Sequence, residues 1–288
     1  MMTVAPLAQR LIHWRFRVTP ETVLNGGAPP ADESIPVAAE LKRAMNAMKA
    51  QAFNLAQGRV NYAALRSSPA YAKYRMCARR LQSYDPGRLQ TDAERLAFWI
   101  NLYNSLVVDA VVAFGVQGSV NEAPGFFWKA AYCVGGQRFS ASDIEHGILR
   151  AGTGHPAIPG PHFGRRDLRR AHRLTKIDPR IHFALVCAAR SCPPIAVYDA
   201  ERIEPQLEAA ARAFVNGGGV EVAGGEVRLS RIFQWYAPDF GGPALGWGDM
   251  RPVLRQLSQW VNDESARRYL AAADLRIKYL AYDWSLNG

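Results

Sequence analysis

The stretch Thr91–Gly115, TDAERLAFWINLYNSLVVDAVVAFG, predicts the element around which the fold is built. Thr91 is followed three residues later by Glu94, which is the spacing of a helix capping box, and Gly115 is a common helix terminator. Between these ends the stretch is apolar nearly all round. Because a helix that is apolar on every side has to be surrounded by protein, we expect it at the centre of the core.

Four polar residues interrupt this predicted helix at spacings of three, one and four: Asn101, Asn104, Ser105 and Asp109. They form a stripe along one side, which is either solvated or buried in a hydrogen-bond network. The apolar surroundings favour burial, and buried amides need partners, so we expect the stripe to brace neighbouring loops. Four polar groups make a membrane span expensive, so no membrane span is predicted.

The rest of the chain predicts further helices and two hairpins around this centre. Helical patterns cover 37–58, 62–84 in pieces, 142–150, 199–214, 230–236 and 249–261, while strand patterns cover 132–139, 181–188, 220–229 and 276–282. We therefore expect one α+β domain over 36–288, with a helical N-terminal half and a small, mostly antiparallel sheet with hairpins. Residues 1–35 lack sustained periodicity and are expected to form an N-terminal arm.

Composition and charge exclude several classes of protein. A chain of 288 residues with 49% hydrophobic content can bury a substantial core. The net charge is +10, and 29 of the 35 basic residues are arginine. Such an excess of arginine over lysine results from coding bias as well as from selection for anion binding. Nucleic-acid binding is therefore not favoured.

The cysteines and the N-terminus indicate a compartment. Four cysteines, Cys77, Cys133, Cys187 and Cys192, are far fewer than a disulfide scaffold needs, so we expect thiols in a reducing environment. Charged residues interrupt every apolar run among the first thirty residues, and no signal peptide is visible. Both observations predict a cytoplasmic protein.

The segment 181–194 holds the candidate chemistry. Ile181–Ala188 has the composition of a buried strand, and Cys192 follows it in a loop. On a regular strand His182 and Cys187 would leave opposite faces, so they do not form a simple pair. The spacing of five and five between His182, Cys187 and Cys192 matches no zinc pattern, and we predict no metal and no cofactor.

Cys192 is the candidate nucleophile. A reactive thiol needs exposure, a base within hydrogen-bond reach and a group that orients the base. His146 or His182 is the candidate base, and Glu145, Asn104 or Asp109 the group that orients it. The alternative is that Cys192 is only a thiol packed in a turn, since the following Pro193 favours extended backbone.

The candidates Glu145 and His146 lie in a short predicted helix that begins near Ser142. Glu145 occupies the position of a capping-box glutamate after Ser142, so a capping role competes with a catalytic one. On an α-helix His146 would point about 100° away from Glu145, and the two side chains should have different partners. No local pattern explains the imidazole of His146, which makes it the stronger catalytic candidate.

Several segments together resemble one family. They are Ala97–Asn104, Asp143–Arg150, Asp178–Leu185, Cys187–Pro194, Phe233–Tyr236 and Tyr282–Asn287. These blocks are similar to the signature blocks of the domain-of-unknown-function 547 family of bacteria and plants, and they span residues 60–288 in order. In that family the cysteine segment usually has Asn where this chain has Val186 and Gly where it has Ala188. The resemblance implies no established activity, and the leucine zipper of plant members is absent here.

Two functions are compatible with these observations. The first is a thiol-dependent hydrolase or acyl-transfer enzyme, with Cys192 as nucleophile, His146 as base and Asn104 or Glu145 positioning the base. Papain and transglutaminases share this set of parts, and their architecture is one option by analogy. The second is a non-enzymatic binding or scaffold module, which binds an anionic ligand or a protein partner through the basic run that contains Arg165, Arg166, Arg169 and Arg170.

Overall fold

The computed structural model describes residues 6–29, 36–54, 58–223, 225–271 and 275–288. Its central helix is α5, Asp92–Phe114, as predicted. The Thr91 side chain accepts a hydrogen bond from the Glu94 N–H, and the Glu94 carboxylate accepts one from the Thr91 N–H, which completes the capping box. Gly115 ends the helix in the left-handed conformation, with φ of 66°.

The core position of α5 accounts for its apolar composition. The helix is long and apolar enough to cross a membrane by length and composition alone, but its most apolar window is 94% buried inside the fold. Every residue from Leu96 to Val112 is buried. The apolar surface of α5 is therefore covered by other parts of the chain.

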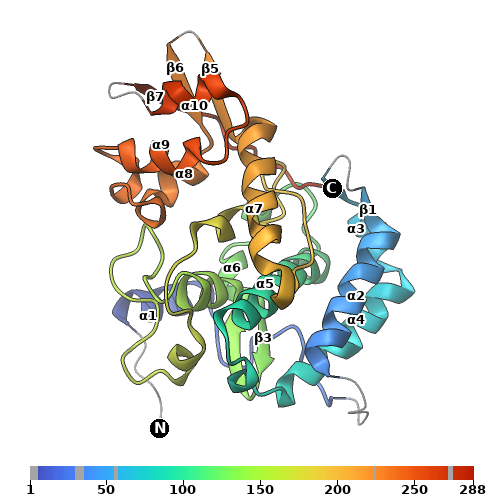
Figure 1. The fold of residues 1–288 in the computed structure, drawn as a ribbon. Coiled ribbons are helices and arrows are strands. Elements are labelled where there is room, and N and C mark those ends of the chain that lie inside the picture. The colour runs from blue at the N-terminus through green and yellow to red at the C-terminus, as the bar shows by residue number, and fades with distance from the viewer. Residues whose placement is uncertain (1–5, 30–35, 55–57, 224, 272–274) are drawn as a thin grey trace.

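The N-terminal helices cover one side of α5, as Figure 1 shows. They are α2, Val37–Ala52, α3, Tyr62–Arg66, and α4, Pro69–Arg80. Helix α2 buries Leu41, Met45 and Met48, which recur at spacings of four and three on one face. The helix predicted over 37–58 is confirmed for Val37–Ala52, but it ends earlier than predicted, because Phe53–Asn54 is extended; the helical pieces predicted over 62–84 are confirmed.

The N-terminal arm contains a helix that the sequence pattern did not predict. Helix α1, Leu7–Phe16, lies against α6, Phe126–Lys129, where the rings of Phe16 and Trp128 stack with centroids 5.6 Å apart. Downstream, the buried side chain of Asn25 donates to the carbonyl oxygens of Ala78 and Cys133. Tertiary contacts rather than helical periodicity hold the described part of this arm on the domain.

The strands form small separate sheets. They are β1, Phe53–Asn54, with β2, Arg59–Val60; β3, Ala131–Val134, with β4, Gln137–Ser140; and β5, Val220–Ala223, with β6, Glu226–Leu229, and β7, Arg276–Tyr279. All neighbouring strands pair antiparallel except β6 and β7, which pair in parallel. Both predicted hairpins are confirmed, with Val134 opposite Gln137 and Ala223 opposite Glu226.

A second hydrophobic cluster lies in the C-terminal part, at the top of Figure 1. Its helices are α7, Ile203–Phe214, α8, Ile232–Trp235, α9, Arg251–Ser258, and α10, Glu264–Leu270. Phe183 reaches into this cluster and contacts the rings of Phe214, Phe233, Phe240 and Trp260. The segment that precedes the cysteines is therefore anchored in the second cluster.

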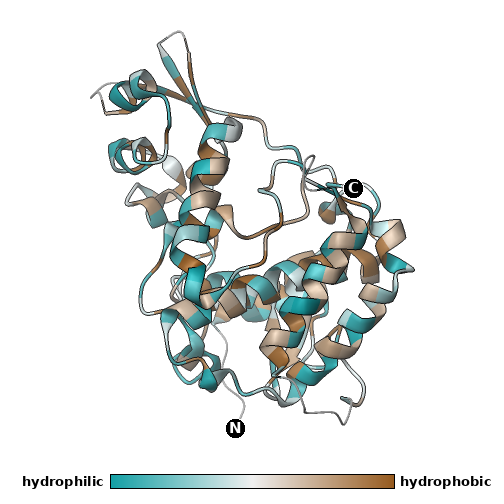
Figure 2. Ribbon diagram, turned by 45° about the vertical axis from the view of Figure 1, so that its right-hand side comes forward, coloured by the Kyte–Doolittle hydropathy of each residue, from teal (hydrophilic) through white to brown (hydrophobic). Residues whose placement is uncertain are grey.

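Short helical turns connect these elements. The 3-10 turns are Leu81–Ser83, Pro86–Arg88, Val120–Glu122, Leu168–His172, Pro179–Phe183, Ala200–Arg202, Ala237–Phe240 and Ala244–Gly246, and the π-helical turns are Asp143–Leu149 and Val215–Gly219. Figure 2 shows that the helices around α5, such as α2 and α4, carry both hydrophobic and hydrophilic residues, as expected of elements that each bury one face. The predicted α+β fold class is confirmed.

The predicted strand over 181–188 is wrong. The chain forms a 3-10 turn, Pro179–Phe183, which Asp178 caps by accepting from the Arg180 N–H, and then continues without regular structure. The side chain of Asn104 donates to the Ala184 carbonyl at 2.9 Å and accepts from the Val186 N–H at 2.9 Å. This amide supplies the donor and acceptor that a neighbouring strand would otherwise provide, so the buried segment needs no sheet.

Candidate functional site

A pocket of about 400 Å³ lies where the two hydrophobic clusters meet. Four of the five predicted site residues line it, namely Glu145, His146, His182 and Cys192. The fifth, Asn104, is fully buried behind the pocket and holds the segment that leads to the cysteines. The structure therefore gathers the candidates in one place and gives Asn104 the bracing role expected of the polar stripe.

Cys187 and Cys192 form a disulfide, which corrects the expectation of four thiols. Ala188, with φ of 65°, has left-handed backbone and turns the chain back, so that Cys187 and Cys192 meet. The position is unusual for a residue with a Cβ, and it is where the resembling family usually has Gly. Cys77 and Cys133 are free.

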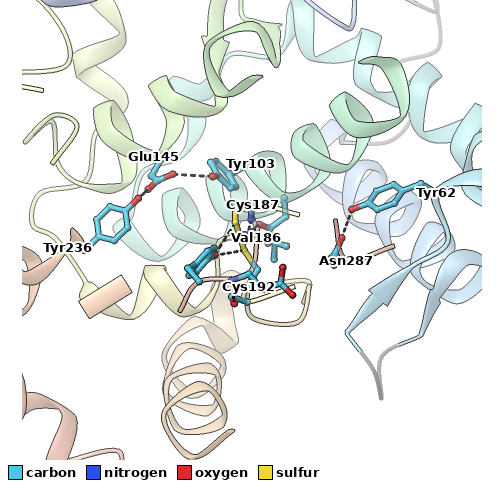
Figure 3. Close-up of a disulfide and its surroundings, with 12 residues drawn as sticks. Tyr62, Tyr103, Glu145, Val186, Cys187, Cys192, Tyr236 and Asn287 are labelled. Atoms are coloured by element: carbon cyan, nitrogen blue, oxygen red, sulfur yellow. Dashed lines mark hydrogen bonds between the residues drawn. A yellow bond between two sulfur atoms is a disulfide. The ribbon is translucent and has the colours of Figure 1, made fainter. Parts of the chain in front are cut away.

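Two hydrogen-bond donors lie next to the sulfur of Cys192, as Figure 3 shows for the backbone of Cys187. The Cys187 N–H donates to Cys192 Sγ at 3.0 Å. The hydroxyl of Tyr282 lies 3.3 Å from Cys192 Sγ and 3.2 Å from Cys187 Sγ. These donors would stabilise negative charge on Cys192 in the reduced protein.

Glu145 lies between two tyrosine hydroxyls and not at a helix cap (Figure 3). Tyr103 donates to Oε2 at 3.0 Å and Tyr236 donates to Oε1 at 2.5 Å. Ser142 has helical backbone and makes no side-chain cap, so the alternative capping-box role is wrong. Burial, and then the nearby Glu145 carboxylate, raise the pKa of both tyrosines well above the usual value, which keeps them protonated as donors.

His146 shares the pocket with Glu145, although an α-helix would separate the two side chains. The turn that carries them is π-helical, and His146 Nδ1 lies 3.9 Å from Glu145 Oε1. Arg150 Nη1 lies 3.4 Å from the same Nδ1. Burial, together with His155 and Arg150, holds the pKa of His146 well below its usual value.

His182 pairs with Asp239, a residue that sequence reasoning missed. His182 Nε2 lies 2.8 Å from Asp239 Oδ2, and the imidazole stacks on the Tyr236 ring with centroids 3.9 Å apart. Arg150 donates to Asp239 through Nε at 2.6 Å and Nη2 at 2.8 Å. Burial alone would raise the pKa of Asp239, but the hydrogen bonds from Arg150 and His182 bring it down to about 2.

A signal for Asp239 was present in the sequence. It follows the block Phe233–Tyr236 by three residues and is the only acidic residue between Glu226 and Asp249. Nothing in its spacing pairs it with His182, because 57 residues separate the two. Only the packing of the 237–240 turn against the 179–183 turn brings the two side chains together.

The arginines of the basic run at 165–170 are not all free to bind an anion. Arg169 donates to Asp167 at 2.8 Å, lies 3.1 Å from Asp143, and stacks 4.4 Å over the Phe163 ring. This arginine therefore stabilises the fold around the buried Asp143. Arg165 and Arg166 are exposed.

Metal ligation finds no support in the described part of the chain. No group of three or more His, Cys, Asp or Glu side chains is arranged there to hold a metal ion. The described residues that line the pocket instead supply three imidazoles, those of His146, His155 and His182, the carboxylate of Glu145 and the cysteine pair.

These features define a class of protein: an α+β domain whose central helix braces a pocket that carries cysteine, histidine and carboxylate groups. Residues 87–215 match the family model described as "Protein of unknown function, DUF547", so this part of the chain is a DUF547 domain; the blocks Phe233–Tyr236 and Tyr282–Asn287 lie outside the match. The match includes Glu145, His146, His182 and both disulfide cysteines. No curated protein and no solved structure matches the chain.

Proposed function

We propose that the protein is a thiol-dependent hydrolase or acyl-transfer enzyme, in which Cys192 becomes the nucleophile when its disulfide with Cys187 is reduced. The observation that carries the proposal is the pair of donors beside Cys192 Sγ, the Cys187 N–H at 3.0 Å and the Tyr282 hydroxyl at 3.3 Å. Donors that stabilise a thiolate lower the pKa of a thiol, and the thiolate is the reactive form.

His146 is the proposed base. Its lowered pKa keeps the imidazole neutral at pH 7, so it can accept the proton of the thiol. Glu145, 3.9 Å away, then stabilises the imidazolium and positions it. The His182–Asp239 pair has the arrangement of the base and its orienting carboxylate in a cysteine–histidine–carboxylate triad, and it is the competing base.

The reaction follows from these roles. The Cys192 thiolate attacks the carbonyl carbon of an ester or amide, and a carbon–sulfur bond forms. The leaving alkoxide or amine takes the proton from the imidazolium, which leaves a thioester on Cys192. Water in a hydrolase, or an alcohol or amine in an acyl transferase, then gives its proton to the imidazole and attacks the thioester carbon. The carbon–sulfur bond breaks, the acyl group leaves as an acid, ester or amide, and the Cys192 thiolate takes the proton back from the imidazolium.

The disulfide fits this proposal if the protein is cytoplasmic, as we propose from its sequence. Cytoplasmic thiol reductants keep cysteine pairs reduced, which would free both sulfur atoms. The form with the Cys187–Cys192 disulfide is then the oxidised, resting form of the protein.

Site-selective alkylation tests the proposal. After treatment with a thiol reductant, iodoacetamide should label Cys192 at least about tenfold faster than Cys77 or Cys133 at neutral pH. Burial raises the pKa of Cys77 to about 12 and also raises the pKa of Cys133, so both should react slowly. Mass spectrometry of the peptides measures the rates, and equal rates at the three sites would contradict the proposal.

Two variants identify the base in the same assay. His146→Ala should slow the labelling of Cys192, whereas His182→Ala should not if His146 is the base. His172→Ala is the matched control, because its imidazole lies outside the pocket. A slower reaction in the His182→Ala protein alone would assign the role to the His182–Asp239 pair.

A non-enzymatic binding module is the second candidate, and the disulfide itself favours it. A sulfur bonded to Cys187 cannot attack a substrate. In this case the pocket binds a ligand without converting it, and Cys192→Ser should retain all function in the cell. Loss of function in that variant would favour the enzyme.

A further inference from the structure

The charges around the pocket are unevenly distributed. Among the described residues that line it, Glu145 is the only Asp, Glu, Lys or Arg. Arg150, the nearest guanidinium, lies behind Tyr236 at 5.2 Å from the ring and is held by both oxygens of Asp239. The pocket wall is therefore acidic although the whole chain carries a net charge of +10.

Glu145 makes its direct contacts with neutral groups, and the Arg150 guanidinium acts on it only through a longer-range charge interaction. Its two hydrogen-bond donors are the hydroxyls of Tyr103 and Tyr236. Its ion-pair contact is His146 at 3.9 Å, and burial keeps that imidazole uncharged at pH 7. A buried carboxylate next to neutral donors is ready to balance the charge of a bound cation.

Aromatic rings form much of the remaining wall. Seven lining residues are aromatic: Tyr103, Phe127, Trp128, Trp235, Tyr236, Tyr282 and Trp284. Trp235, Tyr282 and Trp284 contact one another, with ring centroids 4.8 to 5.8 Å apart. The faces of such rings, together with a carboxylate, are the features that bind substituted ammonium groups.

We propose that this pocket binds a small molecule with a substituted ammonium group, held by the aromatic rings and by Glu145. A volume of about 400 Å³ suits a ligand of that size. This ligand would occupy the pocket of the proposed enzyme. If the proposed function holds, the substrates are therefore esters, thioesters or amides that carry a cationic head group. Binding itself requires neither a free thiol nor a reaction.

A cation and its neutral isostere provide the test. Choline and 3,3-dimethylbutan-1-ol have nearly the same shape, and only choline is charged. Calorimetric titration of the full chain in its oxidised form should give an affinity for choline at least about tenfold higher than for the neutral alcohol. Absence of choline binding, or equal affinity for the two probes, would overturn the proposal.

Two pairs of variants, each a site variant with an exposed control, test which side chains contribute to the affinity for choline. Glu145→Gln should reduce the affinity for choline about tenfold or more, whereas Glu221→Gln on the exposed part of β5 should not change it. Trp284→Leu should weaken binding, whereas Trp14→Leu on the exposed face of α1 should not. If Glu145→Gln disrupts folding, Trp284→Leu still decides, and an unchanged affinity in that variant would contradict the aromatic site.

The binding test can fail or succeed independently of the enzyme proposal. Choline binding together with an unreactive Cys192 would support the ligand class and reject the enzyme. A reactive Cys192 without choline binding would reject the ligand class alone.

Discussion

At the scale of single residues, the site depends on carboxylates whose charge is held by specific partners. Glu145 has two tyrosine donors, and Asp239 has Arg150 and His182. A buried carboxylate without such partners would be strongly destabilising. The same contacts therefore keep these groups inside the fold, and at Asp239 they also lower the pKa of the carboxyl.

Asp239 predicts a dependence of stability on acid. Its pKa in the folded protein is about 2, below the ordinary 3.8, so its ionisation stabilises the fold fully above about pH 4. As the pH falls from about 4 to about 2 this contribution, about 2 kcal/mol, is lost. Denaturant unfolding at several pH values should show a shallower acid dependence for Asp239→Asn than for the native protein.

The control for this pH series is Glu201→Gln, at an exposed position on the surface. That variant should keep the acid dependence of the native protein. If Asp239→Asn and the native protein lose stability in parallel below pH 4, Asp239 does not have the assigned ion pairs in solution.

At the scale of elements, α5 positions the site through the amides of two asparagines. Asn101 donates to the Tyr198 carbonyl at 2.8 Å and accepts from the Tyr198 N–H at 2.9 Å. Asn104 makes the equivalent pair of bonds to Ala184 and Val186. One helix thereby holds the irregular segments on both sides of the disulfide, which explains why amides occur on a helix otherwise surrounded by apolar groups.

Asn104→Asp should test this brace with almost no change in shape. The variant loses the donor to the Ala184 carbonyl and places a carboxylate in the core, so we expect the free energy of unfolding to fall by at least about 2 kcal/mol. Asn262→Asp, on the exposed surface, should change it by less than about 0.5 kcal/mol. Equal stability of the two variants in urea would show that the amide of Asn104 is not a brace.

At the scale of the whole molecule, two hydrophobic clusters meet at the pocket. Phe183 belongs to the C-terminal cluster, while Leu185, two residues later, belongs to the cluster around α5. The last residues of the chain return to earlier segments: Tyr62 of the N-terminal part donates to Asn287, and Ala189 of the cysteine segment bridges to Leu286. The pocket is therefore assembled from segments that are distant in the sequence.

Reduction of the disulfide should weaken the molecule only modestly. Cys187 and Cys192 are five residues apart, so the bond closes a short loop, and a loop of this size contributes about 2 kcal/mol. We expect reduced protein to unfold at a lower urea concentration but to remain folded in its absence, with two additional reactive thiols. Complete unfolding on reduction, or an unchanged midpoint, would contradict this expectation.

The sequence by itself determined the elements whose signals are local. The capping box at Thr91, the glycine turns of both hairpins and the periodicity of α2 each depend on residues a few positions apart. The family assignment likewise followed from short blocks in order.

Only the tertiary structure decided the conformation and contacts of the site. The 179–194 segment forms no strand because Asn104, 80 residues before Ala184, satisfies its backbone. The disulfide depends on a left-handed turn at Ala188, and Asp239 reaches His182 across 57 residues. Side chains from distant segments replaced the hydrogen bonds that local patterns assign to neighbouring backbone, and such replacements leave no periodic signal in the sequence.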